Sequence, residues 1–141
     1  MSKSIFISLP VADVAASAAF YEAVGFTRDA RFSGEAAVSM VWSDTITFML
    51  ASHDFYATLT SKPISDARAT SGALFALALD SRDAVDAFAA AAIAAGGREV
   101  HGAEDLGFMY SRGVEDPDGN GFGPMWMNPA HGASAETEAA A

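Results

Sequence analysis

Apolar and polar residues alternate along the chain in a pattern that predicts the same series of elements twice. In the first series, residues 5–9 form an apolar strand-like run that ends at Pro10. Asp13 is suited to cap an alanine-rich helix, and Gly25 to end it. Three more strand-like runs follow, at residues 27–32, 36–42 and 45–51, with a tight turn at Ser43 and Asp44 between the last two.

The second series has the same order. Residues 73–79 are expected to form a strand, Ser81 to cap a helix, and Gly96 and Gly97 to end that helix. Strand-like runs follow at residues 98–101, 108–114 and 121–127. The sequence therefore predicts an α+β fold of two βαβββ modules, with eight strands and helices near residues 13–24 and 81–95.

The apolar positions also predict which side of each element is buried. In the strand at residues 45–51, Ile46, Phe48 and Leu50 form an apolar face suited to pack beneath a helix. Thr45, Thr47 and Met49 are left on the other face. The expected buried stripes of the two helices are Val14, Ala18, Tyr21 and Val24 in the first, and Val85, Phe88, Ala92 and Ile93 in the second.

Length and composition fit one compact domain. The chain has 141 residues, of which 51% are hydrophobic and 18% charged. We expect module 1 at about residues 4–52, a linker at 53–70, module 2 at about 71–128 and a frayed tail at 129–141. A connection as long as this linker is expected to form a functional flap or a short helix rather than an inert spacer.

Charge and cysteine content exclude several classes of function. The net charge of -10 argues against nucleic acid or an anionic membrane as the main partner, because phosphate contacts need clustered cations. The absence of cysteine excludes disulfides, thiolate metal sites and a cysteine nucleophile. The first apolar run is too short for a signal peptide, and no apolar window is long enough for a membrane span, so a cytoplasmic location is expected.

Two stretches, LPVADVAASAAFYEAVGF and EDPDGNGF, carry a family resemblance. With the repeated βαβββ order, they make the chain similar to the glyoxalase, bleomycin-resistance and extradiol-dioxygenase group, the vicinal oxygen chelate superfamily. The resemblance covers about residues 4–128. It implies two sheets that curl into an incomplete barrel around a shared cavity, with the helices outside, and often a homodimer. Phe55 and Tyr56 are candidate exposed residues for such a contact.

The resemblance also implies where a metal would be bound. Counted from the strand ends and from the Asp118-Gly119 turn, the four ligand positions fall on Phe6, Met49, Leu74 and Gly123, with Phe48 the alternative to Met49. A hard divalent cation needs carboxylate, imidazole or amide ligands, which none of these residues supplies. The sequence therefore predicts no metal and no cofactor.

No other catalytic constellation is indicated. The three histidines, His53, His101 and His131, fall in the linker, at a strand end and in the tail. His101 is interpreted as a surface or half-buried residue and His131 as a solvated one. Spacing suggests no Ser-His-Asp arrangement, and no glycine-rich phosphate loop leads from a strand into a helix.

Strand alternation predicts an apolar ligand site with a few hydroxyl groups. The methionines suit either an adaptable pocket or simple core filling. Arg112 could meet an anionic ligand group, or it could pair within the chain with Glu115, Asp116 or Asp118. The candidate ligand-binding residues are Phe6, Ser8, Thr47, Met49, Leu74, Tyr110, Arg112, Gly123 and Met125.

Two classes of function are compatible with these features. The first is a metal-free protein that binds or sequesters a small, partly apolar molecule, as the resemblance to the bleomycin-resistance branch implies. The excess of acidic residues would suit a cationic ligand. The alternative is a glyoxalase-related lyase, isomerase or dioxygenase, either without metal or with metal at residues other than those named above.

Overall fold

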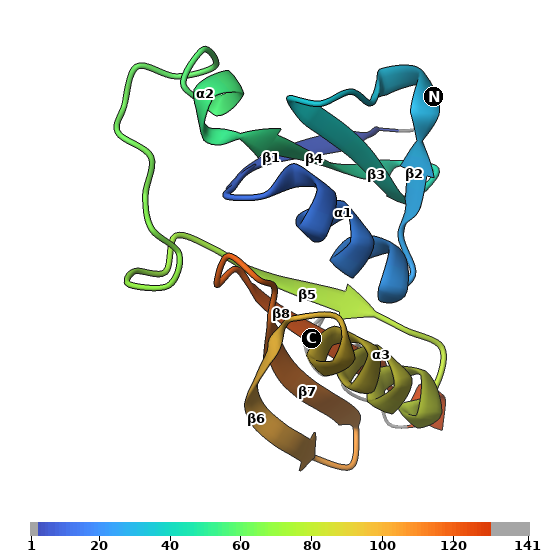
Figure 1. The fold of residues 1–141 in the computed structure, drawn as a ribbon. Coiled ribbons are helices and arrows are strands. Elements are labelled where there is room, and N and C mark those ends of the chain that lie inside the picture. Colours follow the sequence, from blue (N-terminus) through green and yellow to red (C-terminus); the bar gives the residue numbers. More distant parts are fainter. Residues whose placement is uncertain (1–2, 131–141) are drawn as a thin grey trace. The chain divides into compact units, whose positions relative to one another are not determined.

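The computed structural model describes residues 3–130 and divides into two compact units at Thr70 and Ser71 (Figure 1). We call the units module 1 and module 2. The predicted tail beyond residue 130, including His131, lies outside the described residues. Within the described residues, no helix is both long and apolar enough to cross a membrane.

Module 1 contains a sheet with the strand order β1-β4-β3-β2. The first strand runs parallel to β4, and the other pairs are antiparallel. The predicted strand at residues 27–32 is a short strand followed by a 3-10 turn, because the Asp29 carboxylate accepts the Arg31 N–H. The elements are β1 (Ile5–Val11), α1 (Val14–Ala23), β2 (Thr27–Asp29), η1 (Ala30–Phe32), β3 (Ala37–Ser43) and β4 (Ile46–Ser52).

Module 2 repeats this topology with the strand order β5-β8-β7-β6. Its elements are β5 (Leu74–Ala78), α3 (Arg82–Ala94), β6 (Arg98–Asp105), β7 (Met109–Glu115) and β8 (Gly121–Met127). The predicted α+β fold, with two βαβββ modules and eight strands, is confirmed within residues 3–130. Strand β6 extends to Asp105, four residues beyond the predicted end at His101.

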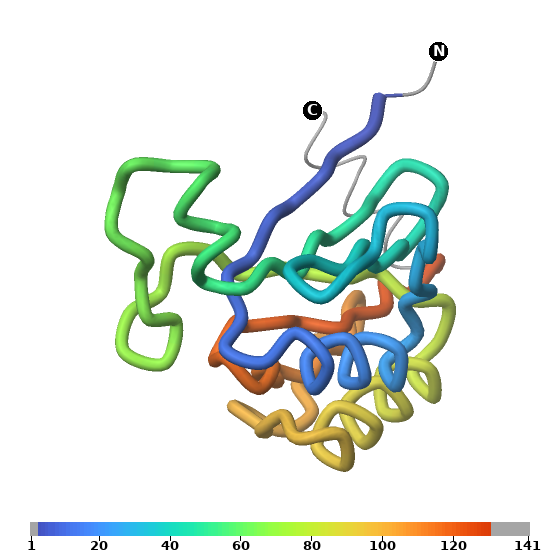
Figure 2. The backbone as a smooth tube through the Cα atoms, turned by 45° about the horizontal axis from the view of Figure 1, so that its top comes forward, coloured from blue at the N-terminus to red at the C-terminus, as the bar shows by residue number. Residues whose placement is uncertain are grey.

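The connection between the modules begins with a four-residue helix, α2 (His53–Tyr56), which the Ser52 hydroxyl caps by accepting the Phe55 N–H. Residues 57–73 then form a loop with turns but no strand, which can be followed in Figure 2. The aromatic residues Phe55 and Tyr56 are half-buried rather than fully exposed.

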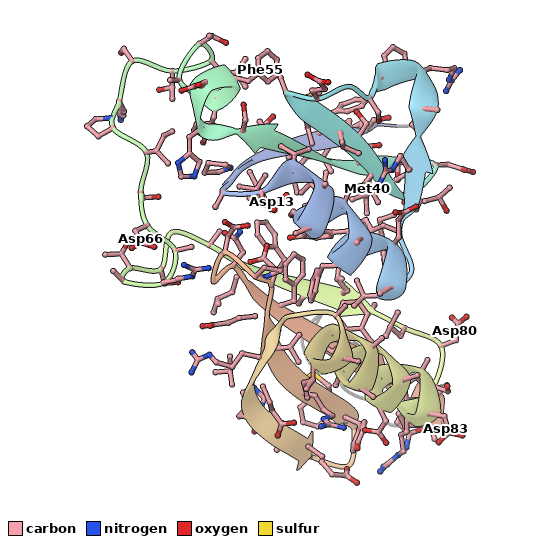
Figure 3. All side chains as sticks on the ribbon, in the orientation of Figure 1. Asp13, Met40, Phe55, Asp66, Asp80 and Asp83 are labelled. Carbon is pink, nitrogen blue, oxygen red and sulfur yellow. The ribbon has the colours of Figure 1, made fainter. Side chains whose placement is uncertain are left out.

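Both long helices begin and end as the sequence predicts. The Asp13 side chain, at the N-terminal end of α1 in Figure 3, accepts the Ala16 N–H at 3.0 Å. At the start of α3, the Ser81 hydroxyl accepts the Ala84 N–H at 3.0 Å. Beyond the helices, Gly25 and Gly96 have φ angles of 114° and 102°, in a region that side chains disfavour.

The core of module 1 is built from aromatic rings. Tyr21 on α1 packs against Phe26 and Phe48, with ring centroids 5.1 and 6.2 Å away. Tyr21, Phe26 and Phe48 are each at most 4% exposed. Three of the four residues predicted for the α1 stripe are buried, and Val14 is half-buried. Of the three residues predicted to pack beneath the helix, Phe48 and Leu50 are buried and Ile46 is half-buried.

The core of module 2 has smaller residues. Helix α3 buries Val85, Phe88, Ala89 and Ala92. The prediction that Ile93 is buried is wrong, since its side chain is 44% exposed. Ile93 lies about 80° around the helix from Val85, at the edge of the buried stripe, whereas Ala89 lies about 40° from it.

The EDPDGN turn between β7 and β8 is held by a buried carboxylate. Asp116 is 3% exposed, and its Oδ1 accepts the backbone N–H groups of Asp118 and Asn120 at 3.0 and 2.8 Å. Its Oδ2 accepts the Asn120 side-chain amide at 2.9 Å. The turn therefore has a structural role in connecting the two strands that requires no metal ligand on β8.

Candidate functional site

Each sheet has one face covered by its helix, which we call the helix face, and an opposite helix-free face. In module 1 the ring contacts of Phe48 with Tyr21 identify the helix face. Successive side chains of a strand point to opposite faces, so Thr47 and Met49 lie on the helix-free face. Phe6 and Ser8 of β1 lie beside them, because the register pairs Phe6 with Thr47 and Ser8 with Met49.

The helix-free face of module 1 combines an exposed aromatic ring with hydroxyl groups. Phe6 is 71% exposed, whereas Ser8, Thr47 and Met49 are half-buried. The next strand contributes Ser39, which is opposite Met49 and 4% exposed. Its hydroxyl already donates to the carbonyl oxygen of Phe32 at 3.2 Å. Ser8 and Thr47 are therefore the nearest candidate polar contacts for a ligand beside Phe6.

In module 2 the buried residues of β8 identify the helix face. Phe122 and Pro124 are buried on the helix face, and the alternating residues Gly123 and Met125 therefore lie on the helix-free face. Leu74 lies on that face too. It is 80% exposed, and its Cδ2 would be 2.7 Å from a Cβ placed on Gly121, its partner in the register.

Gly123 leaves an open place on this face. A Cβ built there would meet no atom closer than the Arg112 carbonyl oxygen at 3.8 Å. The neighbouring strand contributes only the methyl group of Ala76 opposite Gly123. The backbone is thus accessible to a flat molecule beside Leu74 and Met125.

Tyr110 and Arg112 require a correction. They were candidates for the ligand site, but both point to the helix face. The Tyr110 hydroxyl donates to Asp86 on α3 at 2.7 Å, and Arg112 donates to Asp86 at 3.2 Å and to Glu99 at 2.8 Å. The partners considered for Arg112 from the sequence were also wrong. Strand alternation explains the result, since both residues share the face of buried Val114.

These contacts form a charged network along α3. The hydrogen bond from the Tyr110 hydroxyl lowers the pKa of Asp86, and the bonds from Arg112 act in the same direction. Arg82, in the first turn of α3, stacks over the rings of Tyr110 and Trp126 at 5.1 and 5.4 Å. Its guanidinium also pairs with Asp105 at 2.5 Å and lowers the pKa of that carboxyl. The network stabilises module 2 rather than lining its helix-free face.

The four positions that the resemblance assigns to metal ligands are structurally equivalent in pairs. In module 1, β1 and β4 pair Phe6 with Thr47 and Ser8 with Met49. In module 2, β5 and β8 pair Leu74 with Gly121 and Ala76 with Gly123. Phe6 is therefore equivalent to Leu74, and Met49 to Gly123. All four positions lie on helix-free faces. They present a phenyl ring, a thioether, an isobutyl group and bare backbone, which do not fit a hard divalent cation. Among residues 3–130, no group of three His, Cys, Asp or Glu side chains is placed to hold a metal ion.

Sequence reasoning missed one polar residue of the helix-free face. His101 is exposed, as its interpretation as a surface residue implies, but it lies in the middle of β6, opposite Gly113, rather than at a strand end. The pairing of β6 with β7 shifts on both sides of His101, so simple alternation from Arg98 could not place it. A histidine across from a glycine on the next strand was the available signal.

The family model that matches the chain is that of the Glyoxalase/Bleomycin resistance protein/Dioxygenase superfamily, over residues 5–123. The chain belongs to this superfamily. The match confirms the family inferred from the two sequence stretches and the repeated modules. A comparison with curated proteins found no match.

Solved structures of this superfamily share the fold. A glyoxalase/bleomycin resistance protein/dioxygenase family enzyme from Burkholderia phytofirmans PsJN matches with a TM-score of 0.77 and 20% identity, covering 90% of this chain and 100% of that one. A glyoxalase-related enzyme from Fulvimarina pelagi gives 0.76 and 20%, covering 92% and 90%. A hypothetical protein from S. aureus gives 0.76 and 22%, covering 89% and 95%. At these identities the similarity establishes the fold alone.

Proposed function

We propose that this superfamily member binds a small, partly apolar molecule on its helix-free faces without using a metal ion. The observation that supports this proposal is the chemistry of Phe6, Met49, Leu74 and Gly123, which all lie on those faces. A divalent cation there would lose hydration water and gain no oxygen or nitrogen ligand, at a cost of many kcal/mol.

Exposed apolar side chains favour an apolar ligand. Phe6 and Leu74 are 71% and 80% exposed, and they take equivalent places in the two modules. Covering each of them would stabilise a complex by about 1.5–3 kcal/mol before the entropic cost of binding is counted. Met49 and Met125 add flexible, polarizable side chains that can adapt to ligand shape. The net charge of -10 favours a neutral or cationic ligand over an anionic one.

A neutral apolar fluorophore, N-phenyl-1-naphthylamine, tests the binding proposal. The Leu74→Ser variant is expected to bind it about tenfold more weakly than the native chain, because an apolar contact is lost. The matched control is Ile93→Ser, which removes an exposed apolar side chain from α3 and should leave binding unchanged. Equal losses in both variants, or no binding by the native protein, would contradict the proposal.

Metal binding is tested separately by calorimetric titration with Zn²⁺ and Ni²⁺ after chelator treatment. The native chain is expected to show no stoichiometric binding. The combined variant Phe6→His, Met49→Glu, Leu74→His and Gly123→Glu should gain affinity that the native chain lacks. Stoichiometric binding of either ion by the native protein would overturn the metal-free part of the proposal.

The proposal also includes a homodimer, which the superfamily resemblance implies. Sedimentation equilibrium at high protein concentration provides the measurement. A species of twice 14.6 kDa is expected, and a single species of 14.6 kDa would contradict it.

A further inference from the structure

We propose that His101 supplies a hydrogen-bond acceptor to the ligand of module 2, so that the preferred ligand is a planar aromatic molecule with a hydroxyl or N–H donor. This inference rests on the proposed function, because it names the chemistry of the molecule that would bind the helix-free face. It is carried by the position of the imidazole ring and by the one ring nitrogen of His101 that the fold leaves without a partner.

The ring is held over Gly113 on β7. A Cβ built on Gly113 would lie 2.5 Å from both Cδ2 and Nε2 of His101, so the imidazole occupies space that any other residue would fill. Gly113 alternates with Arg112 and Val114, whose side chains point to the helix face. The imidazole of His101 therefore lies on the helix-free face.

The hydrogen bond of the ring determines which nitrogen is available. Nδ1 of His101 lies 2.9 Å from the carbonyl oxygen of Gly102. A carbonyl oxygen can only accept, so Nδ1 carries the proton, and Nε2 of the neutral ring keeps its lone pair. Within the described part of the chain, no hydrogen bond to Nε2 is formed. Nε2 can therefore accept a hydrogen bond from a ligand.

The other charged groups of this face do not occupy Nε2. Arg98 and Glu115 form an ion pair with each other at 2.9 Å. Glu104 lies opposite Ser111, the residue pair that follows His101 and Gly113 along β6 and β7. Its carboxylate is a second possible acceptor, which an experiment must distinguish from His101.

The shape of the face indicates a planar ligand. The register between the pairs Ser111–Met125 and Val114–Phe122 brings Gly113 opposite Gly123, and Ala76 follows on β5. Adjacent strands are about 4.8 Å apart. An aromatic ring lying over Gly123 and Ala76 would thus bring a substituent at its edge to the imidazole above Gly113.

Two probes that differ by one methyl group test the inference. The probes are 4-methylphenol, which has a hydroxyl donor, and its methyl ether 4-methylanisole, which has none. Both are titrated under the same conditions, at about pH 8. The native protein is expected to bind the phenol about tenfold more tightly than the ether, because a single neutral hydrogen bond separates them.

The His101→Phe variant is expected to reduce this preference to about twofold or less, chiefly by weakening phenol binding. Gly113→Ala tests the same point with the imidazole retained, since the added Cβ must displace the ring. It should also reduce the ratio of the two dissociation constants. Glu104→Met, which removes the other acceptor, is the control, and its ratio should equal that of the native protein. Long-range ¹⁵N correlation spectra of the native protein should show the Nδ1-protonated tautomer.

The possible failures are distinguishable. If the native chain binds 4-methylanisole but His101→Phe leaves the ratio unchanged, the role of His101 is overturned and the proposed function stands. A ratio that falls in Glu104→Met instead would assign the acceptor to that carboxylate and likewise overturn the inference. If the native chain binds neither probe, the proposed function and this inference are both overturned.

Discussion

The two modules share one topology but stabilise the packing of helix on sheet by different means. In module 1 the helix face is sealed by aromatic rings, with Phe26 in contact with Trp42 at 4.8 Å and with Phe48 at 5.4 Å. In module 2 part of the same face is occupied by Arg112, which pairs with Asp86 and Glu99. Edge-to-face rings bury large apolar areas, whereas charged groups at a sheet surface depend on partners.

The comparison explains why polar residues do not by themselves mark the site. Tyr110 and Arg112 have the chemistry of ligand-binding residues, yet in module 2 Asp86 and Glu99 hold them on the helix face. The helix-free faces carry the smaller polar groups Ser8 and Thr47 and the imidazole of His101. In both modules the helix face stabilises the fold, and the proposed ligand contacts lie on the opposite face.

The largest effect is expected in the aromatic core of module 1. Phe48→Ala should lower the free energy of unfolding by about 3–5 kcal/mol, because a buried ring is replaced by a void. Urea denaturation followed by tryptophan fluorescence measures the loss. The control Phe6→Ala removes a ring that is 71% exposed and should change stability by no more than about 0.5 kcal/mol. Similar losses in both variants would contradict the assignment of Phe48 to the packed face and Phe6 to the open one.

A smaller effect is expected from the charged network of module 2. Arg112→Met should cost about 2 kcal/mol, since Asp86 and Glu99 would lose their charged donor. Arg98→Met is the control, because its side chain is 71% exposed in its pair with Glu115, and it should cost less than about 1 kcal/mol. Urea denaturation of both variants provides the comparison. A larger loss in the control would show that the network contributes little to module 2.

Replacing the glycine after each long helix should reduce stability by a similar amount in both modules, because both glycines have a positive φ angle. Gly25→Ala and Gly96→Ala should each cost about 1 kcal/mol through the positive φ angle. The added Cβ would have room, with nearest neighbours at 3.8 and 3.9 Å. Thermal unfolding should show similar losses, and Gly72→Ala, which has no such angle and no close neighbour, should show none. Losses that differ widely between the two helix ends would contradict this equivalence.

The smallest effect concerns the dependence of stability on pH in module 2. The folded-state pKa of Asp86 is lowered, first by the Tyr110 hydrogen bond, so its contribution is present above the unfolded pKa of about 3.9 and is lost as pH falls through the folded value. The stability difference between the native chain and Asp86→Asn should be constant near neutral pH and shrink below about pH 4. Urea unfolding at a series of pH values measures it.

Repeating the Asp86→Asn substitution in a Tyr110→Phe variant tests whether the Tyr110 hydrogen bond lowers the pKa of Asp86. Without the hydroxyl, the stability change caused by Asp86→Asn should be smaller near neutral pH, because the principal source of the lowered pKa is removed. An unchanged effect of the substitution would assign the lowered pKa to Arg112 instead.

Local sequence signals predicted most of the fold. Asp13 and Ser81 could be recognised as helix caps because an N-cap needs a side-chain acceptor next to free N–H groups. Gly25 and Gly96 marked the helix ends for a reason that also lies within a few residues of chain. The later end of β6 was missed, because pairing with β7 across shifted register extends a polar strand that has no apolar alternation of its own.

The sequence by itself determined the repeated βαβββ order, the family and the absence of hard ligands at Phe6, Met49, Leu74 and Gly123, since these depend on residue type and spacing. Only the tertiary structure decided that Arg112 donates hydrogen bonds to Asp86 and Glu99, and that the imidazole of His101 lies over Gly113. The physical reason is that a side chain's partners come from other elements, and a register shift of one residue exchanges the two faces of a strand.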